Sequence, residues 1–122
     1  MLRYTVLSIA VLVSVVGLNC KNGDSTQKSE LIGTWDVYLT ELNGRPNDLM
    51  QKAWFSFRDD NLADSNLFGE NNAAGYSVEK GRLIIKAAEP LDLRISKLQG
   101  DTMVLEGKVK FYHMVYHMVR RK

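Results

Sequence analysis

Short stretches in which apolar and polar residues alternate follow one another along the chain from Leu31 to the C-terminus. Phe55 and Phe57 are separated by a serine, for example, and Leu93 and Ile95 by an arginine. A period of two is that of a strand with one face toward a core. Between the stretches lie clusters of Gly, Asn, Asp and Pro, which are typical of hairpin turns. The pattern predicts eight strands, at residues 34–39, 53–58, 62–68, 75–79, 83–87, 91–97, 102–106 and 109–119.

The gaps between these predicted strands are short. Residues 43–48 and 106–108, among others, are expected to form turns. A parallel sheet needs crossover connections of a dozen or more residues, usually helical, and only residues 47–52 could hold a helical turn. The sequence therefore predicts an all-β fold with antiparallel strands, as a sandwich or a barrel.

The same period assigns the faces of the predicted strands. Trp35, Val37 and Leu39 share one face of the first strand and are expected to point into the core. Trp54 falls on the face opposite Phe55 and is expected to point outward. One apolar and one polar face is the arrangement that an antiparallel sheet around a core requires.

The first nineteen residues differ in composition from the rest of the chain. Arg3 precedes an apolar run from Thr5 to Leu18, which as a helix is about 21 Å long, short of the ~30 Å of a membrane core. This length and its flanks are typical of a secretory signal peptide. We therefore expect residues 1–19 to be a helical signal peptide; a buried helix or a short membrane anchor is the alternative.

The single cysteine, Cys20, directly follows this apolar run. One cysteine cannot form an internal disulfide, so a different use for the thiol is expected in an exported protein. The segment Val-Gly-Leu-Asn-Cys that ends at Cys20 resembles a lipobox, in which the cysteine is lipidated and becomes the new N-terminus. Gly17 and Asn19 stand where lipoboxes usually have Leu and a small residue, which leaves ordinary signal-peptidase cleavage as the alternative.

A polar segment links Cys20 to the predicted barrel. Residues 21–30 contain no large apolar side chain and are expected to form a flexible tether. The domain boundaries predicted are thus 1–19 for the signal peptide, 20–30 for the lipidated cysteine and tether, and 31–122 for the β-domain. Lys21 follows the cysteine where an inner-membrane retention signal would be acidic, so the lipoprotein resemblance implies the outer membrane.

Charge gives little indication of a partner. The 16 Lys and Arg residues include Arg3, so the chain from Cys20 onward has 15 basic and 14 acidic side chains. A net charge of +1 offers no strong electrostatic attraction to nucleic acid or to an acidic membrane surface. We expect no nucleic-acid binding, and a monomer that meets the membrane only through its lipid.

Candidate catalytic and metal sites are few. His113 and His117 lie on a predicted strand, where residues four apart are about 13 Å from each other, too far to share one ion. The acidic residues at 59–64 lack the glycine and terminal glutamate of a calcium loop. No Gly-x-Ser-x-Gly or phosphate-binding loop occurs. We therefore expect no enzyme activity, no metal and no cofactor.

Four segments, in order, carry a resemblance to a known family. They are a Gly-x-Trp opening at residues 31–35, a strand with an acidic turn at 55–60, and hairpins at 75–86 and 93–106. In this combination the chain resembles the small lipocalin-like lipoproteins of bacteria. The resemblance implies a small antiparallel barrel of about eight strands, shorter than a lipocalin and without its disulfide.

The Gly-x-Trp motif has a physical role in such a barrel. Gly33 permits close packing or an unusual φ angle, and Trp35 can then plug one end of the barrel. The resemblance implies a basic residue of the last strand across this tryptophan, and Arg120 or Arg121 could supply it through a cation–π contact. An ordinary core tryptophan with a solvated basic tail is the alternative.

The resemblance also implies a function. We expect a non-catalytic, membrane-anchored module that binds a small hydrophobic ligand, lined by residues expected to face inward: Phe55, Phe57, Tyr76, Val78 and Leu93. The alternative is a filled barrel that contacts another envelope protein or a host protein through outward aromatic residues such as Trp54 and Tyr38. An open apolar cavity would favour the first of these.

Overall fold

The computed structural model describes residues 26–48, 50–69 and 73–122. These residues form a short 3₁₀ helix and nine strands, and the all-β prediction is confirmed. The helix is η2 (Lys28–Glu30); the strands are β1 (Gly33–Leu42), β2 (Arg45–Asn47), β3 (Trp54–Phe57), β4 (Leu62–Ser65), β5 (Ala74–Glu79), β6 (Arg82–Ile85), β7 (Leu91–Gln99), β8 (Thr102–Val109) and β9 (Tyr112–Arg120). Within the described residues, no helix is long and apolar enough to cross a membrane.

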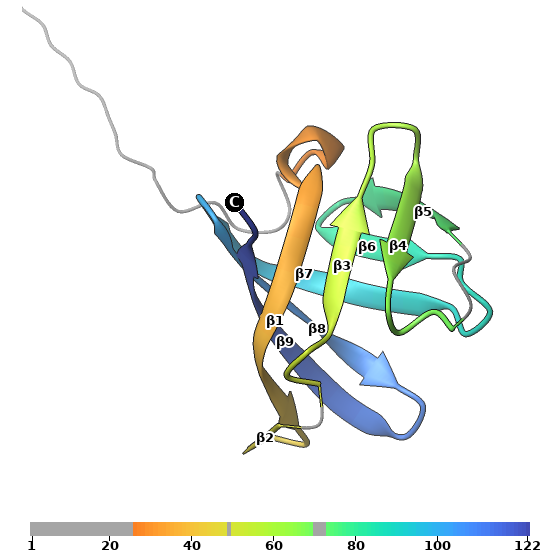
Figure 1. The fold of residues 1–122 in the computed structure, drawn as a ribbon. Coiled ribbons are helices and arrows are strands. Elements are labelled where there is room, and N and C mark those ends of the chain that lie inside the picture. Colours follow the sequence, from red (N-terminus) through yellow and green to blue (C-terminus); the bar gives the residue numbers. More distant parts are fainter. Residues whose placement is uncertain (1–25, 49, 70–72) are drawn as a thin grey trace, which may run out of the picture.

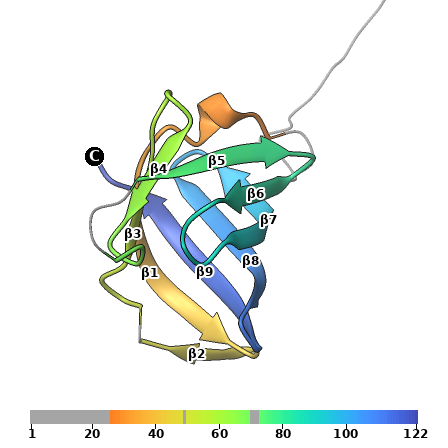
Figure 2. The ribbon, with the colours of Figure 1, turned by 90° about the vertical axis from the view of Figure 1, so that its right-hand side faces the viewer.

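Eight of the strands close into a barrel (Figure 1). The order is β1-β3-β4-β5-β6-β7-β8-β9, each strand antiparallel to the next, and β9 pairs back onto β1 from Trp35↔Arg120 to Leu42↔Met114. The ninth strand, β2, lies at the foot of the barrel along the end of β1 (Figure 2). The predicted antiparallel barrel of about eight strands is thus confirmed, and it is consistent with a lipocalin-like fold.

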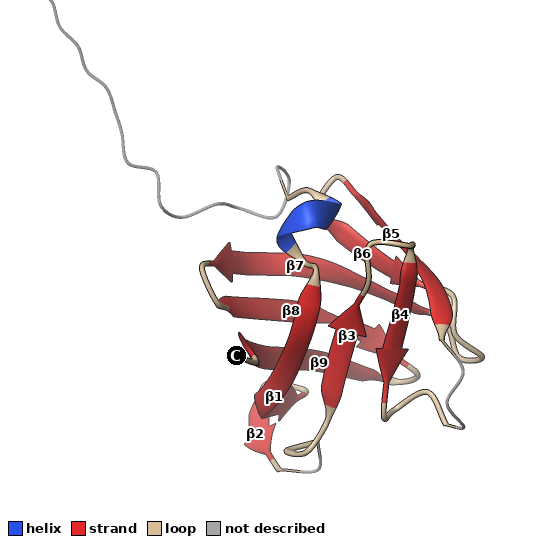
Figure 3. Ribbon diagram, turned by 45° about the horizontal axis from the view of Figure 1, so that its top comes forward, coloured by secondary structure: helices blue, strands red, loops and turns tan. Residues whose placement is uncertain are grey.

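The barrel has two different ends, which we name here. The closed end carries η2 and the turns that lead into β4, β6 and β8 (Figure 3). The open end carries the β1–β2 turn, the β8–β9 turn, and the connections into β3, β5 and β7. Each strand therefore has one half near the closed end and one half near the open end.

A β-bulge changes the face pattern of β1. The pairing register with β9 shifts between Val37 and Leu39. Trp35 and Val37 point inward as predicted, but Leu39 is not in the core, and Thr40 is buried in its place. A bulge puts two residues opposite one, so every side chain beyond it changes face.

The last predicted turn was misplaced. Residues 106–108 lie inside β8, which continues to Val109, and the turn to β9 falls at Lys110 and Phe111. Gly107 is there because the backbone of β7 passes close by: a Cβ at Gly107 would lie 2.9 Å from the Asp92 carbonyl oxygen. A glycine inside a strand can mark a close approach as well as a turn.

Two other boundaries differ from the prediction. β2 lies within residues 43–48, which were expected to be a turn only. β4 ends at Ser65 instead of residue 68, because the Ser65 hydroxyl accepts a hydrogen bond from the Leu67 amide at 3.0 Å and turns the chain.

Residues before Leu31 also form regular structure. Residues 28–30, predicted to belong to the tether, form η2, where the Gln27 amide donates to the Glu30 carboxylate at 2.9 Å. Thr26 is already buried. The predictions for the signal peptide and for Cys20 concern residues outside those that the structure describes.

Candidate functional site

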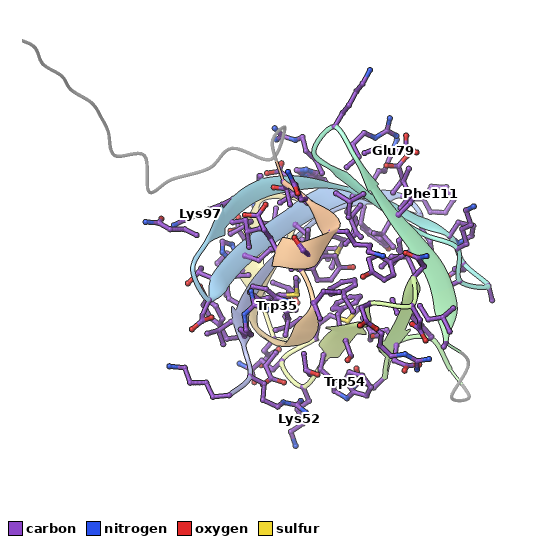
Figure 4. All side chains as sticks on the ribbon, turned by 90° about the horizontal axis from the view of Figure 1, so that it is seen from above. Trp35, Lys52, Trp54, Glu79, Lys97 and Phe111 are labelled. Carbon is purple, nitrogen blue, oxygen red and sulfur yellow. The ribbon has the colours of Figure 1, made fainter. Side chains whose placement is uncertain are left out.

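Trp35 fills the closed end of the barrel. Its side chain is fully buried, and its indole nitrogen donates to the Leu31 carbonyl oxygen at 2.9 Å. In the view down the barrel, Trp35 lies inside the ring of strands, whereas Glu79 and Lys97 point away from it (Figure 4). At this end the apolar ring of the tryptophan is thus buried and its indole nitrogen has a hydrogen-bond partner.

Arg120 covers the tryptophan from the last strand. Its guanidinium carbon lies 4.3 Å from the centre of the Trp35 ring, within cation–π range. The same guanidinium donates to the carbonyl oxygens of Ile32 and of Glu30, the latter at 3.0 Å, and to Asp101 at 3.1 Å. Arg120 therefore ties three parts of the closed end to one side chain.

Gly33 leaves the space that this arginine needs. Its φ is +131°, and a Cβ there would lie 3.0 Å from an Arg120 guanidinium nitrogen. The structure thus brings Gly33, Trp35 and Arg120 together. Arg121 takes a different role: it pairs with Asp36 at 2.6 Å on the outer surface, and this hydrogen bond holds the pKa of Asp36 below its ordinary value.

Aromatic side chains fill the middle of the barrel. The rings of Phe55 and Phe57 are parallel at 6.3 Å, and Phe57 contacts Tyr76 at 5.2 Å between ring centres. The Tyr76 hydroxyl donates to the Arg58 carbonyl oxygen at 2.7 Å. With Leu93, which is fully buried, these residues belong to the packed core.

A cavity of about 620 Å³ opens at the other end. This volume lies in the range of small-molecule sites, roughly 300–1,000 Å³. Its wall is mostly apolar and comes from the open-end halves of the strands and from the connections beside them. Its lining residues are Leu42, Asn47, Met50, Leu67, Phe68, Gly69, Ala87, Ala88, Glu89, Leu91, Val109, Lys110, Tyr112, Met114 and Tyr116.

None of the five residues predicted to line a ligand site lines this cavity. Phe55 lies just beneath it, with its ring centre 6.0 Å from Tyr116 and 6.3 Å from Phe68. Tyr76 and Val78 line a second, more polar depression beside β5, together with Lys28 and other residues. Phe55, Phe57 and Leu93 of the predicted set thus belong to the buried core.

Few polar groups reach the cavity. Tyr116, on β9, is 2 % exposed, and burial raises the pKa of its phenol. The Asn47 side-chain oxygen accepts a hydrogen bond from the Thr40 hydroxyl at 3.1 Å. At the rim, Lys110 and Glu89 form an ion pair of 3.4 Å. An apolar wall with a few placed polar groups is typical of sites for small amphiphilic molecules.

The rim of the cavity also exposes large apolar side chains. Leu67 and Tyr112 line the cavity and are 40 % and 46 % exposed. Phe111, in the adjacent β8–β9 turn, is 87 % exposed and points away from the barrel (Figure 4). Apolar surface is therefore gathered around the entrance.

The two histidines lie on the outer face of β9, away from the cavity. The His117 Nε2 atom is 2.7 Å from the Glu41 carboxylate, and the His113 Nε2 atom is 3.5 Å from Glu106. Each histidine thus has its own carboxylate partner. Across the described ranges, no group of three or more His, Cys, Asp or Glu side chains is placed to hold a metal ion.

Sequence reasoning missed the cavity residues for two reasons. Met114 and Tyr116 share the inner face of β9 with Met118, and their period-two spacing within the predicted strand 109–119 is a signal that could have found them. Met50, Phe68 and Ala87 lie in connections, where no periodicity reports which way a side chain points.

Comparison of the chain with models of protein families, with curated proteins and with solved structures finds no match. The site is therefore interpreted from its own geometry.

Proposed function

We propose that this protein is a non-catalytic module that binds a small, mainly hydrophobic ligand in the cavity at the open end. The single observation that carries this proposal is the cavity of about 620 Å³. Burial of an apolar molecule there is favourable by roughly 25 cal/mol for each Å² removed from water. The methionines Met50 and Met114 have flexible side chains that can adjust to the shape of a ligand.

We further propose that Cys20 is lipidated and anchors the protein in a bacterial membrane, with the outer membrane as the expected site. The sequence supports this through the apolar run before Cys20. The described part of the chain starts at the closed end, beside η2.

Native mass spectrometry of the protein purified from its own host tests the ligand proposal. We expect a complex heavier than the polypeptide by the mass of one small lipid-like molecule, lost on denaturation. Purified protein that carries no such mass, and does not enhance the fluorescence of anilinonaphthalene sulfonate, would overturn it.

Labelling with a fatty-acid probe tests the anchor separately. We expect incorporation into the native chain and none after Cys20→Ala. Equal labelling of the two would contradict lipidation at Cys20 without affecting the ligand proposal.

The second candidate function is contact with another protein. The exposed aromatic residues Tyr38, 52 % exposed on β1, and Phe111 favour it, since aromatic residues are frequent anchors of interfaces. Trp54, the other anchor proposed from the sequence, is half-buried. This function does not need the cavity, so the mass measurement distinguishes the two.

A further inference from the structure

The hydroxyl of Tyr116 differs from the other polar groups of the buried aromatic residues. Trp35 donates to the Leu31 carbonyl oxygen and Tyr76 to the Arg58 carbonyl oxygen. Tyr116 is 2 % exposed and Tyr76 5 %, yet none of the described residues forms a hydrogen bond with the Tyr116 hydroxyl. This hydroxyl is not one of the fully enclosed polar atoms of the described residues, so it faces the cavity. Tyr116 also belongs to the wall of the cavity, whereas Trp35 does not.

The hydroxyl of Tyr116 is a polar group in a mostly apolar cavity wall. Tyrosine hydroxyls in apolar surroundings usually have a hydrogen-bond partner, and one that faces a cavity can take it from a molecule inside the cavity. The Tyr116 ring lies 6.0 Å from the ring of Phe55, and Met114 precedes it on the inner face of β9. Thr40, opposite Tyr116 on β1, directs its hydroxyl to Asn47. Its partner therefore comes from what occupies the cavity, which is water until a ligand displaces it.

We propose that the ligand enters with an uncharged oxygen leading, and that this oxygen accepts a hydrogen bond from the Tyr116 hydroxyl. This inference rests on the proposed ligand-binding function and narrows the ligand to an amphiphile with a carbonyl, ester or hydroxyl oxygen at one end of an apolar body. The apolar body then lies against Met50, Phe68 and Leu91, toward the entrance.

The charges around the cavity select an uncharged oxygen over a carboxylate. Lys110, a cation of the lining, lies at the exposed rim and is paired with Glu89. A carboxylate beside Tyr116 would be a buried charge without a counter-ion, which is far more costly than a buried neutral oxygen. Fatty acids would therefore bind with the carboxylate at the rim and leave Tyr116 unused.

The test compares 2-undecanone with 2-methyl-1-undecene, which has CH₂ in place of the carbonyl oxygen. Affinities of both are measured for the native protein, freed of bound lipid, and for Tyr116→Phe. We expect the ratio of ketone to alkene affinity to fall by about two- to tenfold in Tyr116→Phe, the range of one net hydrogen bond. Using a ratio cancels the different hydration of the two ligands.

Tyr112→Phe is the matched control. Tyr112 also lines the cavity but lies at the rim, half-exposed, so its loss should leave the ratio unchanged. Because the Tyr116 hydroxyl bonds to no described residue, Tyr116→Phe should fold and melt like the native protein.

Three results would overturn the inference. An unchanged ratio in Tyr116→Phe refutes the hydrogen bond while the ligand-binding function stands. If decanoate binds more tightly than the ketone and Tyr116→Phe does not change the affinity for decanoate, the polar end of the ligand lies at the rim. If neither the ketone nor the alkene binds the native protein, the proposed function fails together with the inference.

Discussion

The two ends of this barrel are built from the same strands, yet one is filled and the other is hollow. At the closed end Trp35, the largest side chain in the core, is covered by Arg120 and by η2. At the open end the wall includes small and flexible side chains such as Ala87 and Met114. Eight strands enclose a space that side chains can just fill, so the choice of end residues decides whether a cavity remains.

The polar groups of the two ends differ in the same way. The indole of Trp35 and the guanidinium of Arg120 have protein partners, and they make the closed end a fixed plug. The Tyr116 hydroxyl at the open end has none among the described residues. We propose that the closed end serves stability and the open end serves binding, and each prediction below tests this division.

Removing the plug should have the largest effect. Trp35→Ala deletes a fully buried indole and should lower the free energy of unfolding by about 3–5 kcal/mol, measured by urea denaturation. Trp54→Ala is the control on the outer face of β3, where the side chain is half-buried, and should cost much less. Equal losses in the two variants would contradict a plug at Trp35.

Filling the cavity should lower ligand affinity without lowering the stability of the fold. Ala87→Phe places a ring in the cavity and should lower ligand affinity at least tenfold, since a ligand of the same space is excluded. The melting temperature should stay near that of the native protein because the cavity can hold the added atoms. If anilinonaphthalene sulfonate bound the Ala87→Phe variant as tightly as the native protein, the ligand site would lie outside this cavity.

Removing the cover over Trp35 should have an intermediate effect. Arg120→Ala leaves two backbone carbonyl oxygens without their donor and removes the contact with the indole face, for an expected loss of about 1–3 kcal/mol. Arg121→Ala, one residue later, removes only an exposed ion pair and should change stability far less. A reversed order would show that Arg121 is the structural arginine.

Low pH should slightly lower the free energy of unfolding by protonating Asp36, near the closed end. Its pKa is lowered from 3.8 by the hydrogen bond with Arg121, so the folded protein is stabilised above that pH and loses this contribution as the pH falls below it. Asp36→Asn should remove this part of the acid dependence in thermal melts between about pH 5 and 3. The effect is small because the pair is exposed to solvent.

Strand positions could be predicted because period two survives wherever one face is buried, as in Phe55 and Phe57. The pattern failed at the bulge after Val37 and at Gly107, where a close approach of β7 determines the residue. The Trp35–Arg120 contact was among the arrangements considered from the sequence, since a lipocalin-like opening suggests it. The position of the cavity could not be predicted from the sequence. Alternation marks both Phe55 and Tyr116 as inward, but it does not show where along the barrel axis the interior stops being filled by side chains.

The most direct test of the division uses the methionine methyl groups. Met50 and Met114 line the cavity, whereas Met103 and Met118 are fully buried in the core outside it. In methyl NMR of ¹³C-labelled protein titrated with 2-undecanone, we predict shifts for Met50 and Met114 and little change for Met103 and Met118. Equal shifts for all four, or shifts confined to Met103 and Met118, would contradict a binding site at the open end.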